Sequence, residues 1–218
     1  MGNGSFIIFI VLLINFAISY WNARVVGTVW IETKEMGGIA RFMAWMGAIQ
    51  SASGFSWCYL FILLVGAQYA EPFFRNANQP QILTNEAIRA GFSLGYIVLI
   101  PGILFSGLAI WIQSLVQAWR ERDLPSMGAA AWNTFAQIHN MASAMRGMPE
   151  AFGSVKDFFG GESDSDDDSD GAKGKAIILV LILVIVAIIG GVMTTWAIIN
   201  QYAGSKPMGP KPDFQRQR

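Results

Sequence analysis

The stretch AIILVLILVIVAIIGGVMTTWAII, residues 176–199, decides the fold class of this chain. It contains no charged side chain and is longer than the roughly 20 apolar residues that cross a hydrocarbon core about 30 Å thick. A buried helix in a soluble protein is seldom so uniformly apolar over this length. The stretch therefore predicts a helix that spans a membrane.

Three stretches upstream repeat this pattern. Residues 6–21 carry no charge, and together with the amphipathic residues 25–31 they predict one long first helix. Residues 42–69 and 90–119 also lack Asp, Glu, Lys and Arg, which predicts a second and a third span. The whole chain is 53% hydrophobic and 14% charged, whereas about a quarter of the residues are charged in ordinary soluble domains. We expect an all-α integral membrane protein with four transmembrane helices.

The distribution of charge divides the chain into three regions. Residues 1–123 hold the first three spans, residues 124–175 form an extramembrane loop, and residues 176–218 hold the fourth span and a polar, basic tail. Lys and Arg near the span ends favour both termini on the outside of a cytoplasmic membrane, either inner or plasma. The basic tail, Lys211 to Arg218, favours the opposite orientation.

The loop between the third and fourth spans divides into three parts, of which the middle one, residues 149–161, is a short second amphipathic piece. Its first part predicts an amphipathic helix that lies on the membrane or on the bundle. One face of this helix is apolar and consists of Trp132, Phe135, Ile138 and Met145. Its last part, ESDSDDDSD at residues 162–170, places six carboxylates in nine positions and cannot bury apolar surface, so we expect a disordered acidic tether.

Small residues recur at helical spacing along the spans and form seams for helix packing. In the second span the seam consists of Ala44, Gly47, Ser51, Gly54 and Cys58. In the third span it consists of Gly91, Gly95, Gly102, Ser106 and Ala109, and the fourth span contributes Gly191. Helices in lipid associate by close approach, which small residues allow. Either the seams face one another in a compact monomer, or one is left for self-association or another membrane subunit.

Polar side chains inside the spans have two interpretations. Asn15 and Gln50 lie deepest in their apolar stretches, where an amide needs a hydrogen-bond partner, so interhelical hydrogen bonds are the first interpretation. The second is a polar path through the membrane, lined by Gln50, Ser51, Ser53 and Ser56. Intramembrane transport sites usually contain an ionisable residue, and the four charge-free stretches contain none, which favours the structural interpretation.

Composition and motifs argue against several functional classes. Fifteen basic residues balance fifteen acidic ones, so there is no basic excess to attract nucleic acid. One cysteine and one histidine cannot build the usual zinc sites, and we find no catalytic motif, so we expect no catalytic residue, cofactor or metal. The sequence favours a non-catalytic protein that assembles or scaffolds a membrane complex. Its expected partners are the lipid bilayer and other membrane subunits or its own copies, and the alternative function is an oligomeric channel or small-solute carrier.

Overall fold

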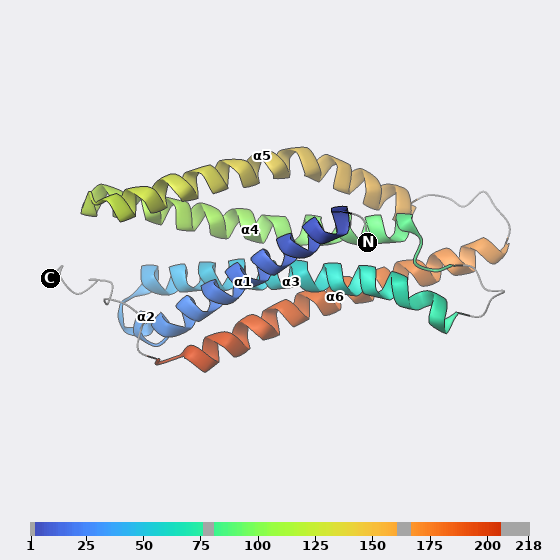
Figure 1. The fold of residues 1–218 in the computed structure, drawn as a ribbon, viewed down its shortest axis with the longest axis horizontal. Helices are drawn as coiled ribbons and strands as arrows, with labels where there is room; N and C mark the ends of the chain where they lie inside the picture. Colours follow the sequence, from blue (N-terminus) through green and yellow to red (C-terminus); the bar gives the residue numbers. More distant parts are fainter. Residues whose placement is uncertain (1–2, 76–80, 161–166, 206–218) are drawn as a thin grey trace.

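Helices make up the regular structure throughout residues 3–75, 81–160 and 167–205, which the computed structural model describes. Their order along the chain is α1 (Asn3–Val29), α2 (Glu32–Glu35), α3 (Gly38–Phe74), α4 (Asn85–Glu121), α5 (Leu124–Gly160) and α6 (Asp167–Tyr202). The long helices run roughly along a common axis, and α1 and α6 are both inclined to α3, α4 and α5 (Figure 1). The prediction of an all-α protein is confirmed.

Four helices are long and apolar enough to cross a membrane. They are Ile7–Val29 within α1, Gly38–Phe74, Asn85–Glu121 and Ala172–Tyr202 within α6. Each contains most or all of one predicted span, which confirms the prediction of four long apolar helices. Large apolar side chains also point outward from α6, where Ile178, Ile185 and Val192 are each more than half exposed. Such a surface is suited to contact with lipid, and these features together indicate a membrane protein.

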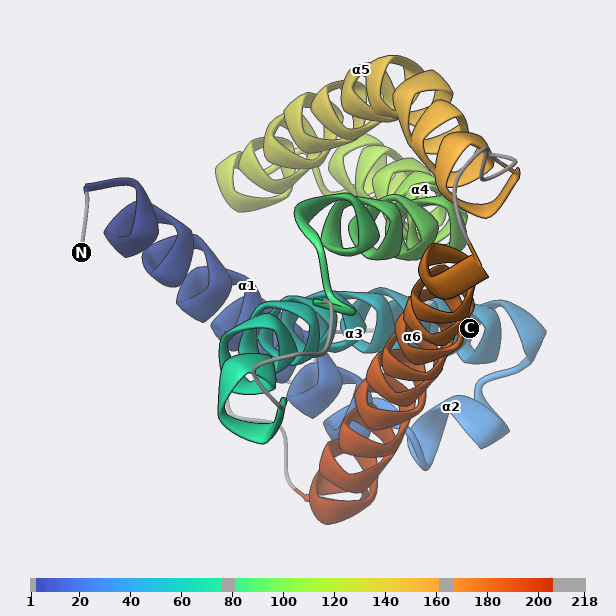
Figure 2. The same cartoon turned by 90° about the vertical axis from the view of Figure 1, so that its right-hand side faces the viewer.

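α3 is the central helix of the bundle. It packs against α1, α4 and α6, and an end-on view shows these helices arranged around it (Figure 2). Two leucines of α3, Leu60 and Leu64, lie in the largest buried cluster together with Val180 of α6. Phe55 is fully buried in a second cluster that includes Ala23 of α1. α3 therefore supplies the packing surface for three neighbours.

Glu71 and Thr84 hold the connection between α3 and α4 in place. The carboxylate of Glu71 accepts hydrogen bonds from the backbone N–H groups of Ile82 and Leu83, at 2.5 and 2.8 Å. Thr84 caps the start of α4, because its hydroxyl oxygen accepts the N–H of Ala87 at 3.2 Å. Both contacts satisfy backbone donors that otherwise lack an intrahelical partner.

A tight turn folds α5 back along α4. Arg122 ends α4 in the left-handed conformation, with φ of 53°, and Asp123 follows it. The Asp123 carboxylate accepts the backbone N–H of Ser126 at 2.8 Å and so caps α5. Hydrogen bonds from the side chain and backbone of Ser126 lower the pKa of Asp123 below its ordinary value.

α5 differs from the predicted loop structure in its continuity. The sequence indicated two amphipathic pieces, the second beginning at Pro149, whereas the structure has one helix over Leu124–Gly160 with Pro149 inside it. Part of the predicted acidic tether, residues 162–166, lies outside the described residues. α6 begins at Asp167, so the last four residues of that acidic run are helical.

Candidate functional site

Asn15 of α1 makes the hydrogen bonds that its position in an apolar stretch requires. Its amide nitrogen donates to the backbone carbonyl of Gly54, at 3.1 Å, and approaches the sulfur of Cys58, at 3.3 Å. Both partners belong to the small-residue seam of α3. The structure therefore brings Asn15 to this seam and gives its amide an interhelical partner.

Small residues of the α3 seam allow α1 to approach closely. A Cβ atom added to Gly47 would lie 2.6 Å from a methyl carbon of Val26, and one added to Gly54 would lie 2.1 Å from the hydroxyl oxygen of Ser19. Ala44 belongs to the same buried cluster as Val26. The seam of α3 is thus occupied by α1 of the same chain.

The seam of α4 faces a different side of α3. Added Cβ atoms would lie within 3.3 Å of an α3 side chain in three pairs, Gly91 with Leu64, Gly95 with Leu60, and Gly102 with Ser53. Ser106 is fully buried and donates its hydroxyl to the carbonyl of Gly102, at 2.7 Å. Ala109 is half-buried farther along the helix. The two helices are in close contact where side chains are smallest.

Gly191 of α6 packs directly on the backbone of α3. A Cβ atom at this position would lie 2.6 Å from both the carbonyl oxygen of Ala52 and the backbone nitrogen of Ser56. Nearby, the hydroxyl of Ser56 donates to the carbonyl of Ile188, at 3.4 Å. The three seams therefore supply contacts within the bundle.

Gln50, Ser53 and Ser56 lie within about 120° of one another on α3, whereas Ser51 lies on the opposite side of the helix. At about 100° per residue, Ser53 lies roughly 200° and Ser56 roughly 140° around the helix from Ser51. Ser53 lies beside Gly102 of α4 and Ser56 donates to α6, while Ser51 is fully buried and its hydroxyl has no hydrogen-bond partner. Gln50, which is half-buried, lies about 100° from Ser51 in the other direction. Ser51 therefore lies on the opposite side of α3 from the other three residues, and the polar path stays a prediction.

The apolar face predicted for α5 points away from the bundle. Exposed fractions of 61–78% are found for its four predicted residues, Trp132, Phe135, Ile138 and Met145. The opposite, polar face packs on α4: Gln137 is 4% exposed and donates to the carbonyl of Leu104, at 3.2 Å. An apolar outer face over a hydrogen-bonded polar inner face is the arrangement expected where lipid surrounds a helix. Placement of this helix at the membrane surface stays a prediction.

A cavity of about 240 Å³ that is widely open to the molecular surface lies between α3, α4 and α5. Aromatic side chains form much of its wall, and they are in contact with one another: the Trp57 ring lies 6.2 Å from Phe92 and 6.3 Å from Tyr96. The hydroxyl of Tyr96 donates to the backbone of Ser143, at 3.0 Å, which joins α4 to α5 beside the cavity. A Cβ atom on Gly147 would lie 2.7 Å from that hydroxyl, so a glycine on α5 makes room for the Tyr96 ring.

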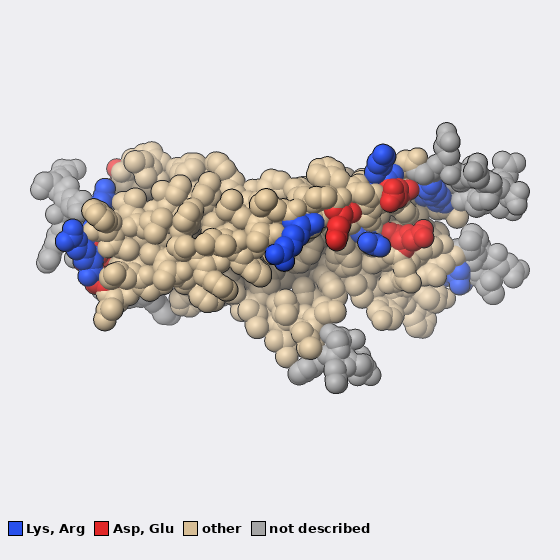
Figure 3. All heavy atoms as spheres, turned by 90° about the horizontal axis from the view of Figure 1, so that it is seen from above, with Lys and Arg blue, Asp and Glu red and all other residues tan. Residues whose placement is uncertain are grey.

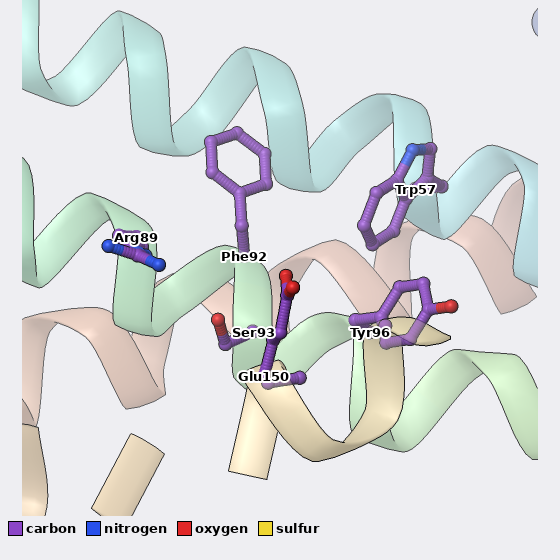
Figure 4. A pocket seen from close by; sticks show the side chains of 8 residues that line it. Trp57, Arg89, Phe92, Ser93, Tyr96 and Glu150 are labelled. Atoms are coloured by element: carbon purple, nitrogen blue, oxygen red, sulfur yellow. The ribbon is translucent and has the colours of Figure 1, made fainter. Parts of the chain in front are cut away.

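Two opposite charges also line this cavity. Arg89 and Ser93 come from α4 and Glu150 from α5, and the Glu150 carboxylate points toward the side of α3 that carries Trp57 (Figure 4). On the face that includes α5, charged residues gather over the right-hand part and at the left end, and the stretch between them is free of charge (Figure 3). The cavity thus combines an aromatic wall with one cation and one anion. None of these residues was predicted as a site from the sequence.

The sequence gives only a weak signal for this cavity. Arg89 is the charged residue directly before the charge-free residues 90–119, and Glu150 lies far from it along the chain. The turn between α4 and α5 brings these two residues to the same level along the bundle axis.

Within the described residues, no group of three or more His, Cys, Asp or Glu side chains is arranged to hold a metal ion. Comparisons with known proteins place the chain in no family: no family model matches it, and no curated protein or solved structure is significantly similar to it.

Proposed function

We propose that this chain is a non-catalytic, multi-pass membrane protein that acts in the assembly or scaffolding of a membrane complex. Its small-residue seams supply packing inside the bundle, so a partner subunit binds the outer surface instead. The N-terminal half of α1 is the surface that supports this proposal best. A transmembrane helix of another subunit is the partner that its dimensions and apolar character suit.

The exposure of α1 is the observation that carries the proposal. In its first half, exposed fractions of 38–61% are found for large apolar side chains spread over most of the helix circumference, at Ile7, Ile8, Phe9, Ile10, Val11, Leu13 and Ile14. Among residues 7–29 of α1, the buried ones all lie in the second half of the helix, at Ser19, Ala23, Val26 and Gly27. An end-on view shows the first half leaning away from the other helices (Figure 2). Part of this helix is therefore free to pack against another subunit.

Site-specific photo-cross-linking tests this proposal in native membranes. A benzophenone amino acid replaces Phe9 or Leu13, one at a time, and the matched controls carry it at Ile185 or Val192 of α6. All four positions have apolar, substantially exposed side chains. We expect the α1 positions to give a protein adduct of defined mass and the α6 positions to give lipid adducts.

The identity of the adduct decides between assembly with another subunit and self-association. Mass spectrometry of the cross-linked band identifies either a second protein or a second copy of this chain, and both results support an assembly role. Lipid adducts alone at Phe9 and Leu13, as at the α6 positions, would contradict it.

A further inference from the structure

The cavity between α3, α4 and α5 lies where charged residues resume beside two charge-free stretches. On α4, Arg89 directly precedes residues 90–119, which carry no charge. On α5, residues 124–145 carry no charge, and Glu150 lies about one turn beyond Arg146, the first charged residue after them. Charged and aromatic side chains at the end of an apolar span are typical of the level of the lipid headgroups.

The two charges in the cavity have no partner among the residues that the structure describes. Neither Arg89 nor Glu150 forms an ion pair or a side-chain hydrogen bond with another group in the described part of the chain. The same cavity nevertheless contains both, together with the hydroxyl of Ser93. A guanidinium forms strong, bidentate hydrogen bonds with phosphate, and a carboxylate accepts hydrogen bonds from an ammonium group. The cavity therefore suits a ligand that carries both groups.

The surroundings of the cavity favour a lipid over a freely soluble ligand. Its lining includes the partly exposed aromatic rings of Trp57, Phe92 and Tyr96, and it lies at the end of the charge-free residues 90–119, along which acyl chains would extend. The exposed Met145 and Phe152 lie on the opposite face of α5 from Glu150 and do not border the cavity. The cavity volume of about 240 Å³ is below the usual range for whole small-molecule ligands, roughly 300–1,000 Å³, so it fits a headgroup whose chains remain outside.

We propose that this cavity binds the zwitterionic headgroup of phosphatidylethanolamine. Arg89 binds the phosphate and Glu150 accepts hydrogen bonds from the ammonium group. The aromatic wall of Trp57 and Tyr96 contacts the apolar part of the headgroup and the glycerol. This lipid site is independent of the proposed assembly role, because lipid binding requires no partner subunit.

Lipid titration followed by native mass spectrometry tests the site on the full chain. The delipidated protein in micelles is titrated with dioleoyl phosphatidylethanolamine and, separately, with dioleoyl phosphatidylglycerol, which has the phosphate but no ammonium group. We expect Glu150→Gln to weaken phosphatidylethanolamine binding by about fivefold or more and to leave phosphatidylglycerol binding unchanged. Arg89→Gln should weaken both lipids, because both carry the phosphate.

Two variants outside the cavity serve as controls. Glu86→Gln removes an exposed carboxylate from the first turn of α4, and Arg146→Gln removes an exposed guanidinium from α5 one turn before Glu150. Both should bind the two lipids as the unmodified protein does. The Arg89 and Glu150 side chains are also exposed, so these variants should keep the elution volume and melting temperature of the unmodified protein.

Three results would overturn the proposal. The first is equal binding of the two lipids together with no effect of Glu150→Gln. The second is phosphatidylethanolamine binding that survives Arg89→Gln. The third is binding of the soluble headgroup glycerophosphoethanolamine as tightly as the lipid, which would show that acyl chains play no part. Failure of the cross-linking experiment on α1 affects none of these readouts, so the two proposals are tested separately.

Discussion

The packing of α3 against α6 leaves no room for a side chain at Gly191. A Cβ atom there would lie 2.1 Å from the Ser56 hydroxyl and 2.6 Å from two backbone atoms of α3. A side chain can rotate away from such a clash, but a helix backbone cannot. We expect Gly191→Ala to force the helices apart and to lower the free energy of unfolding by about 1–3 kcal/mol. The unfolding midpoint in micelles measures this change.

Gly66→Ala is the control for the change at Gly191. Gly66 lies within α3, and an added Cβ atom meets nothing within 4 Å. We expect this variant to stay within about 0.5 kcal/mol of the unmodified protein. Equal effects of the two substitutions would mean that α3 and α6 do not pack as closely as the structure shows.

Two fully buried serines make a matched test of hydrogen bonding at the residue scale. The Ser51 hydroxyl has no partner, whereas the Ser106 hydroxyl donates to the carbonyl of Gly102 at 2.7 Å. Removing an unpartnered buried polar group costs no hydrogen bond, so Ser51→Ala should leave stability unchanged or raise it by about 1 kcal/mol. Ser106→Ala should lower stability by roughly 0.5–1.5 kcal/mol. Reversible unfolding in micelles compares them, and equal losses would indicate that Ser51 has a partner.

At the scale of elements, the start of α3 depends on a glycine in an unusual conformation. Gly37 has a φ of +99°, a value that side chains other than glycine rarely adopt, while Gly38 is the first helical residue. An added Cβ atom meets nothing within 4 Å at either position. We expect Gly37→Ala to lower the free energy of unfolding by about 1–3 kcal/mol through backbone strain alone. Gly38→Ala should be neutral or slightly stabilising.

The comparison of these two glycines isolates the backbone conformation. Because neither new side chain clashes, a difference in unfolding midpoint reports the strain at Gly37. Equal midpoints would show that the connection between α2 and α3 adapts to an alanine without cost.

At the scale of the whole molecule, α6 is held by contacts with three helices. It packs against α1, α3 and α4, and its connection to α5 passes through residues outside the described ranges. We expect residues 1–163 and 164–218, expressed as two polypeptides, to co-purify from micelles. Gly191→Leu in the second polypeptide should reduce recovery by roughly fivefold or more, because the helices can no longer meet. Recovery that is unaffected by this substitution would contradict the packing of α6 on α3.

The sequence by itself determined that the chain forms four long apolar helices and where most of them lie. Apolarity over about 20 residues is a local property, so residues 176–199 predict a span without knowledge of their neighbours. The need of Asn15 for a partner was also visible in the sequence, because an amide in an apolar stretch is costly unless it is hydrogen-bonded. The identity of that partner was not.

Only the tertiary structure decided which faces of the helices are covered. The amphipathic pattern of α5 indicates two faces, but the hydrogen bond from Gln137 to α4 shows that the polar face is the inner one. Arg89 and Glu150 meet in one cavity only because the turn at Arg122 and Asp123 reverses the chain. Contacts between residues distant in sequence depend on how helices are oriented and paired, and residue spacing within one helix does not contain this information.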